Sequence, residues 1–163
     1  AEILCSLGQT VLISNYQEYY KLVDYFGRFS KKRQGLVMGV NNLSELFDEK
    51  YYRDLQGGIL EAFGRIFSKD LKILVYPFQE NETVKVLRKE DAEVHPRFRP
   101  IIDYLNFHNR IIDIEHIDEE IKNIFSRDVL RKIRSGEEGW EICLPQYVDR
   151  VIKEKELFGY TAD

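Results

Sequence analysis

The sequence has few of the residues that build metal sites, disulfide frameworks and membrane spans. Its 163 residues include only two cysteines, three histidines, four prolines and one tryptophan. Two cysteines cannot form a disulfide framework, so we predict that Cys5 and Cys143, both inside apolar patterns, are reduced and buried. No two histidines are spaced i, i+4 and none lies near a cysteine, which argues against a metal site. No apolar run approaches membrane-spanning length, and no signal-peptide pattern opens the chain.

A large excess of positive charge is also missing. The formal net charge is −4, so no global field attracts nucleic acid, and any basic site must be local. With 44% hydrophobic and 32% charged residues, the composition is typical of a globular protein. No repeat or linker divides the chain, so we predict a single domain over 1–163 in an intracellular compartment, the cytoplasm or an organellar matrix. Because the sequence starts at Ala1 without a methionine, we expect a fragment or a processed part of a longer chain.

Short apolar runs alternate with helical patterns along the chain. The runs at 10–14, 35–40 and 71–76 are apolar on both faces and predict buried strands. An alternating run at 83–88 predicts an edge strand, and 110–117 predicts a further strand. The predicted fold is therefore α/β, with a three-layer, mostly parallel, Rossmann-like sheet, helices on both faces and a helical carboxy-terminal region.

Polar side chains follow the first two predicted strands. Ser14 and Asn15 come after the first strand, and Asn41 comes after the second. In an open parallel sheet, ligands bind beyond the carboxyl ends of the strands, where these side chains can orient a sugar or a nucleotide. The alternative is that they cap the helices that follow.

Gly57 and Gly58 stand at a predicted helix start. Backbone N–H groups there, together with the helix dipole, can hold a phosphate. The segment lacks the Lys-Ser/Thr of a P-loop and is not Gly-x-Gly-x-x-Gly. The alternative is that the two glycines only form a tight turn.

Near the carboxy terminus a basic helix is followed by a second amphipathic helix. Ser126 is the predicted N-cap of the first helix and Gly136 ends it, whereas Pro145 suits the first helical position of the second. Between the helices, Trp140 is flanked by alternating apolar residues. We predict that its ring is buried and anchors the last helix to the rest of the protein.

This region resembles the carboxy-terminal end of nicotinate or nicotinamide mononucleotide adenylyltransferases. In that family a Ser-Ser-Thr-x-x-Arg run at a helix start holds the ATP phosphates, and Ser126 and Arg131 match its first serine and its arginine. The positions that match the family's closing helix are Leu144, Pro145, Val148, Ile152 and Leu157.

The chain departs from the family at two places. Arg127 and Asp128 stand where the family has a serine and a threonine, and Asp128 repels phosphate. The family's histidine segment, of the type Gly-x-Phe-x-Pro-x-His-x-Gly-His, does not occur in this sequence. Phosphoryl transfer depends on such positioned charge, so the catalytic residues stay unknown and adenylyl transfer by this chain alone is not expected.

Two classes of function follow. The first is a nucleotide-type ligand-binding α/β domain related to a nucleotidyltransferase, with ATP or a pyridine mononucleotide as ligand and no catalysis by itself. The alternative is a non-catalytic interaction or structural domain of a larger assembly. Aromatic residues make up 13% of the chain and can form a surface for a protein partner. Neither class involves nucleic acid.

Overall fold

The computed structural model describes residues 1–79, 86–115, 118, 121 and 124–161, and the chain divides into two compact units. The larger unit contains residues 15–117, and the smaller contains residues 1–14 and 118–163. Each unit has its own hydrophobic core. The single domain over 1–163 stays a prediction.

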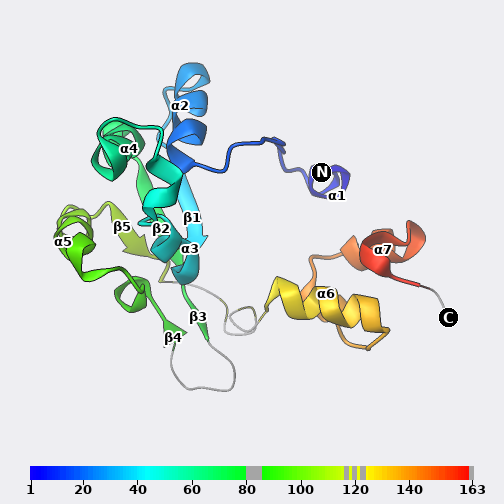
Figure 1. The fold of residues 1–163 in the computed structure, drawn as a ribbon. Coiled ribbons are helices and arrows are strands. Elements are labelled where there is room, and N and C mark those ends of the chain that lie inside the picture. The colour runs from blue at the N-terminus through cyan, green and yellow to red at the C-terminus, as the bar shows by residue number, and fades with distance from the viewer. Residues whose placement is uncertain (80–85, 116–117, 119–120, 122–123, 162–163) are drawn as a thin grey trace. The chain divides into compact units, whose positions relative to one another are not determined.

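The larger unit is built on a three-stranded parallel sheet (Figure 1). Its strands, in spatial order, are β1 (Gly35–Gly39), β2 (Lys72–Tyr76) and β5 (Ile111–Asp113). In the central strand, Ile73 and Val75 are completely buried. The structure thus confirms the α/β class and the parallel pairing of two predicted strands. The strand predicted at 110–117 is shorter, and residues 116–117 lie outside the described residues.

Helices separate the strands in sequence, as the crossover between parallel strands requires. The helices of this unit are α2 (Tyr19–Phe29), α3 (Val40–Glu45), η1 (Glu49–Tyr52), α4 (Gly58–Ile66), η2 (Phe67–Lys69), η3 (Lys89–Asp91), η4 (Pro96–Phe98) and α5 (Arg99–Phe107). A small antiparallel pair, β3 (Phe78–Gln79) and β4 (Val86–Leu87), precedes η3. The predicted edge strand is therefore present as β4, while 83–85 lie outside the described residues.

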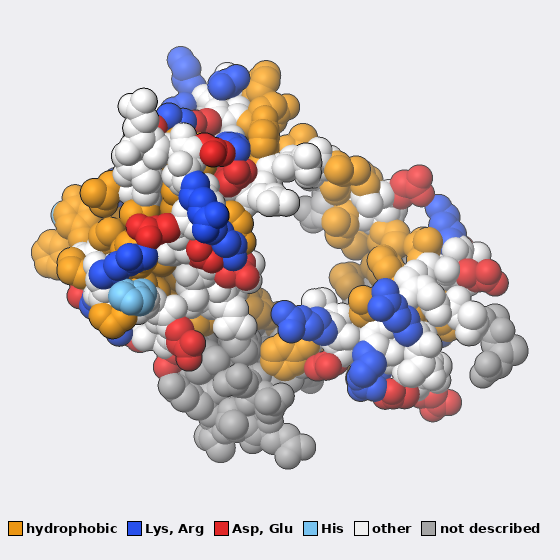
Figure 2. Space-filling view, viewed as in Figure 1, with side chains coloured by type: hydrophobic (Ala, Val, Ile, Leu, Met, Phe, Trp, Pro, Cys, Tyr) orange, Lys and Arg blue, Asp and Glu red, His pale blue; other side chains and the backbone are white. Residues whose placement is uncertain are grey.

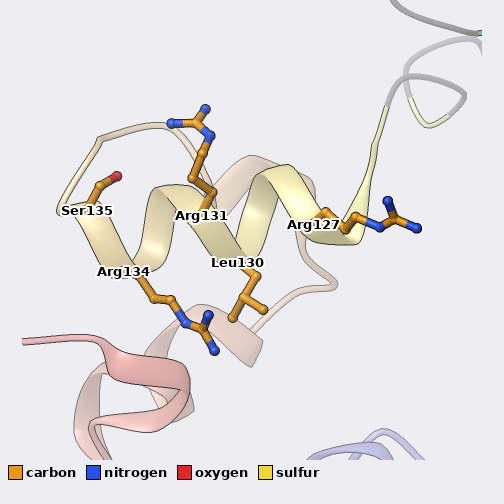
Figure 3. A pocket seen from close by; sticks show the side chains of 5 residues that line it. All are labelled: Arg127, Leu130, Arg131, Arg134 and Ser135. Carbon is orange, nitrogen blue, oxygen red and sulfur yellow. The ribbon is translucent and has the colours of Figure 1, made fainter.

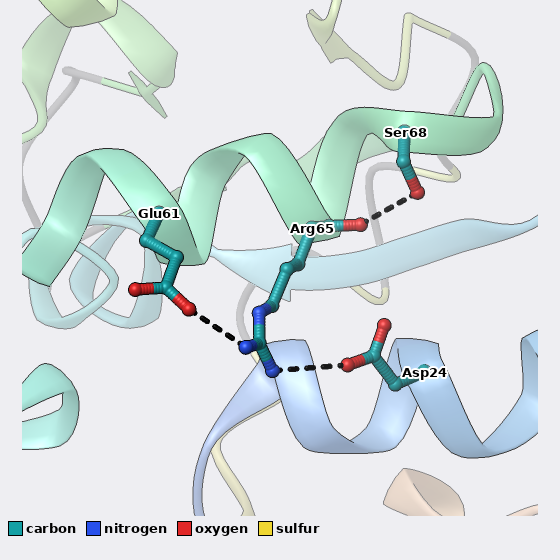
Figure 4. Close-up of polar contacts among 4 residues, drawn as sticks. All are labelled: Asp24, Glu61, Arg65 and Ser68. Carbon is teal, nitrogen blue, oxygen red and sulfur yellow. Dashed lines mark hydrogen bonds and ion pairs between the residues drawn. The ribbon is translucent and has the colours of Figure 1, made fainter. Parts of the chain in front are cut away.

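Helices α2 and α4 are joined by an arginine between them (Figure 4). The Arg65 guanidinium lies 2.7 Å from the Glu61 carboxylate on its own helix and 3.5 Å from Asp24 on α2. The Ser68 hydroxyl donates to the Arg65 carbonyl at 2.8 Å. These charges are partly exposed, so their ion pairs add little free energy, and burial of the apolar faces stabilises the helix pair.

The predicted strand at 10–14 is wrong. Residues 9–17 are all described and form neither helix nor strand, and the Ile13 side chain is 82% exposed. β-Branched residues favour a strand only where a neighbouring strand and a packed face receive them. Ser14 and Asn15 therefore do not follow a strand, and both are exposed.

The smaller unit is helical. Its elements are α1 (Glu2–Ser6), α6 (Ser126–Ser135), η6 (Glu141–Cys143), α7 (Val148–Glu154) and η7 (Leu157–Gly159). The core consists of Val129, Ile133, Trp140, Val148 and Ile152. Trp140 is only 3% exposed, and its ring centroid lies 6.0 Å from that of Tyr160. The predicted burial of Trp140 is confirmed.

Two further predictions about this unit are wrong. Helix α7 begins at Val148 and not at Pro145, because Tyr147 has a left-handed backbone (φ 72°) that interrupts the helix. Cys5 is exposed, since the five-residue helix α1 buries none of its residues. Cys143 is half-buried, and both thiols are free.

Candidate functional site

Helix α6 places three arginines on one face. Arg127, Arg131 and Arg134 are spaced i, i+4 and i+7, which brings them to the same side of an α-helix. With Leu130 and Ser135 they line a shallow groove of about 460 Å³, which we call the arginine groove (Figure 3). Figure 3 shows Arg131 and Ser135 along one border of this face, and Leu130 and Arg134 along the other.

A carboxylate from the next turn already contacts the arginine groove. Arg131 donates to Glu137, and the Ser135 hydroxyl donates to the same carboxylate oxygen at 2.8 Å. The Ser135 hydroxyl and the Arg131 guanidinium together hold the pKa of Glu137 below its usual value, so Glu137 is an anion at neutral pH. A negatively charged group therefore lies beside Arg131 where an anionic ligand would bind.

Arg134 connects α6 to the end of the unit. Its Nε donates to the Phe158 carbonyl at 3.4 Å. This bond fixes one side of the guanidinium group and orients it along the lower border of the groove in Figure 3. Arg127, at the first turn, is exposed.

The start of α6 differs from the prediction. The N-cap is Phe125, one residue before Ser126, and within the described chain no side chain caps this end. Ser126 is the first helical residue and is exposed. Arg131 lies five positions after Ser126, so at 100° per residue their side chains leave the helix on different faces. Ser126 as N-cap is therefore wrong, and it does not line the arginine groove.

The larger unit holds the other predicted site residues. Asn41 is the second residue of α3, directly after β1, and its side chain is exposed at the carboxyl end of that strand. Gly57 and Gly58 form the start of α4, as predicted. The Gly57 N–H donates to the Glu61 carboxylate at 2.9 Å, and this bond is the main reason that the pKa of Glu61 is lowered. The start of α4 therefore already binds an anion, the Glu61 carboxylate.

The predicted residues are divided between the two units. Ser14, Ser126 and Arg131 belong to the smaller unit, and Asn15, Asn41, Gly57 and Gly58 to the larger. What the structure brings together is Arg131 with Arg127 and Arg134. The sequence analysis did not identify Arg127 and Arg134 as site residues, although their i, i+4, i+7 spacing with Arg131 is visible in the sequence.

A second hollow lies between α4 and α5 in the larger unit. This groove, of about 470 Å³, is lined by Leu60, Phe63, Gly64, Phe67, Pro100, Ile101, Tyr104 and Leu105. Leu60 is 67% exposed and Tyr104 is 62% exposed. The lining is almost entirely apolar, so this groove suits an apolar side chain and not a charged ligand.

In the part of the chain that the structure describes, no group of three or more His, Cys, Asp or Glu side chains could hold a metal ion. None of the described helices has the length and apolar character needed to cross a membrane.

Comparison of the chain with models of protein families, with curated proteins and with solved structures finds no match.

Proposed function

We propose that the chain binds a nucleotide-type ligand through its phosphate groups at the arginine groove, without being catalytic by itself. The observation that carries the proposal is that Arg127, Arg131 and Arg134 all line one shallow groove along α6. A guanidinium group binds phosphate through two parallel hydrogen bonds and keeps its charge at every physiological pH. Three such groups match the charge of a di- or triphosphate.

The ligand competes with Glu137 for Arg131. In the structure the Glu137 carboxylate occupies hydrogen-bond donors that a phosphate would use. Both side chains are exposed, so exchanging one anion for another costs little desolvation. ATP and a pyridine mononucleotide, the ligands implied by the resemblance of this region to mononucleotide adenylyltransferases, both carry phosphate. A Rossmann-like layering of the larger unit is part of the same proposal.

Calorimetric titration with ATP and with nicotinamide mononucleotide tests the proposal. Arg131→Ala removes a charged hydrogen bond worth about 1.5–3 kcal/mol, so we expect affinity to fall by about tenfold or more. Glu137→Gln removes the competing anion, and we expect it to bind the nucleotide more tightly than the native chain. Arg150→Ala is the matched control, because Arg150 is exposed on α7 in the same unit and contacts only the Tyr147 ring among the contacts described. Equal affinities for native chain and Arg131→Ala would contradict the proposal.

The alternative, a non-catalytic interaction domain, is favoured by the apolar groove between α4 and α5. Exposed apolar surface of this kind commonly receives the apolar face of a helix from a partner protein. If this alternative holds, titration with either nucleotide at millimolar concentration gives no heat of binding. Sedimentation of the native chain then reveals an association, and Leu60→Arg abolishes it. Nucleotide binding with monomeric sedimentation would exclude it.

A further inference from the structure

Helix α2 carries apolar side chains on two opposite faces. One face buries Tyr20 and Val23 in the larger core. Tyr25 and Phe29 leave the helix on the other side, and Phe26 lies beside them. Phe29 is 74% exposed, and Phe26 is also exposed. A surface helix normally has one apolar face, so the second face indicates contact with something apolar outside the described residues.

The exposed rings of Tyr16, Phe26 and Phe29 form one cluster around the half-buried Tyr25. The Tyr25 ring centroid lies 5.0 Å from that of Phe29, 5.8 Å from Phe26 and 5.9 Å from Tyr16. We call these four residues the aromatic cluster. Their mutual contacts hold the rings at the end of α2, so little side-chain freedom is left to lose when they contact a partner.

Basic residues lie next to the aromatic residues of α2 in the sequence. Residues 25–34 contain Arg28, Lys31, Lys32 and Arg33 and no acidic residue, in a chain whose net charge is −4. We call these four side chains the basic rim.

We propose that the aromatic cluster and the basic rim bind the surface of an anionic lipid membrane. The rings enter the boundary between headgroups and acyl chains, while the long lysine and arginine stems keep their charges at the lipid phosphates. The end of α2 and the loop to β1 lie at one end of the larger unit, at the top of Figure 1. Figure 2 shows basic and hydrophobic side chains next to each other there.

Single-stranded nucleic acid is the other anionic macromolecule that binds to basic and aromatic side chains. Its bases stack on aromatic faces that are free and flat. Here the rings tilt against one another, by 52° for Tyr25 with Phe29 and by 78° for Tyr25 with Phe26, so they cover part of each other's faces. This geometry favours insertion of ring edges into a lipid interface.

Sedimentation of the full chain with vesicles tests the proposal. We expect binding to vesicles that contain phosphatidylserine, loss of binding at high salt, and none to pure phosphatidylcholine vesicles. Phe29→Ser and the double variant Lys31→Glu, Lys32→Glu should each weaken binding by about tenfold or more. Phe107→Ser, on exposed α5 of the same unit, and Arg53→Glu are the matched controls and should bind like the native chain.

Three outcomes would overturn the proposal: equal binding to neutral and anionic vesicles, native-like binding by Phe29→Ser, or a single-stranded oligonucleotide that binds more tightly than the vesicles. Melting of each variant, followed by circular dichroism, checks that it is folded. Arg131→Ala should leave vesicle binding unchanged, so this test is independent of the proposed nucleotide site.

Discussion

Tyr52 is a polar side chain inside the larger core. Its hydroxyl donates to the Leu46 carbonyl at 2.6 Å, and burial raises the pKa of the phenol. Tyr52→Phe keeps the ring but removes the donor from a buried carbonyl, so we expect a loss of about 1–3 kcal/mol in the free energy of unfolding. Urea denaturation measures it. Tyr104→Phe, at an exposed ring, is the control, and equal midpoints for both variants would contradict the prediction.

Trp140 is the largest side chain of the smaller core. It packs with Val129, Ile133 and Ile152, and Lys153 Nζ lies 5.2 Å from its ring centroid. We expect Trp140→Ala to cost about 3–5 kcal/mol, because the vacated volume cannot collapse fully. Ile142→Ala, at a nearby exposed position, should change stability little. An unchanged melting temperature for Trp140→Ala would instead make the ring a partner contact.

Sequence reasoning was most successful for buried apolar residues. The apolar run at 71–76 identified the central strand, in which Ile73 and Val75 are completely buried. Sequence reasoning failed where contacts in the folded chain determine whether a side chain is buried or paired. Cys5 lies in an apolar pattern but on a helix that buries nothing, and the pairing of Arg131 with Glu137 depends on how the turn after α6 folds back.

Helix α4 contains two glycines with opposite roles. Gly58 begins the helix at φ +55°, a conformation that strains any residue with a Cβ, whereas Gly64 lies inside the helix with open space around a Cβ. We expect Gly58→Ala to destabilise the protein by about 1 kcal/mol and Gly64→Ala to stabilise it by about 0.5–1 kcal/mol. Thermal melting compares the two variants directly, and a shift of the same sign in both would refute the assignment.

Strands and helix ends differ in how well sequence patterns predict them. The runs at 10–14 and 35–40 are both short and apolar, yet only the second pairs with a neighbour, β2, over residues 35–39, and its last residue, Val40, begins α3. Propensity describes a residue's fit to a sheet and contains no information about whether a partner strand is there. The predicted helix starts differ from the observed ones by one residue at Ser126 and by three at Pro145. Capping signals are local, and several neighbouring residues can satisfy them equally well.

The division of the chain into two units could not be predicted from sequence. No linker marks the boundaries at 14–15 and 117–118, and the first residues of the chain join the last ones. Lys155 donates to Glu2 at 2.9 Å, and Ile3 and Leu7 pack on the smaller core. Periodicity reports on residues a few positions apart, so a contact across 153 positions leaves no local pattern.

Acidic side chains with lowered pKa values occur throughout the molecule. They are Glu2, Glu18, Asp48, Glu61, Glu137 and Glu141. In Glu2, Glu18, Asp48 and Glu141 the main cause is a hydrogen bond from a lysine; in Glu61 it is the Gly57 N–H and in Glu137 the Ser135 hydroxyl. Their side chains range from 19% exposed in Glu18 to 86% in Glu2, so all six reach solvent, and each ion pair contributes little and is weakened by salt.

The sign of their combined effect gives a pH prediction. A carboxyl whose folded pKa lies below its unfolded value stabilises the protein above the unfolded pKa, near 4.5 for Glu and 3.8 for Asp, and this stability is lost as pH falls through the folded pKa. We therefore expect the melting temperature to stay level from neutral pH down to about pH 5 and then to fall toward about pH 3. Lys155→Gln, which removes the partner of Glu2 alone, should make this fall shallower, and added salt should do the same. A melting temperature that rises on acidification over this window would show that repulsion among the acidic residues outweighs their ion pairs.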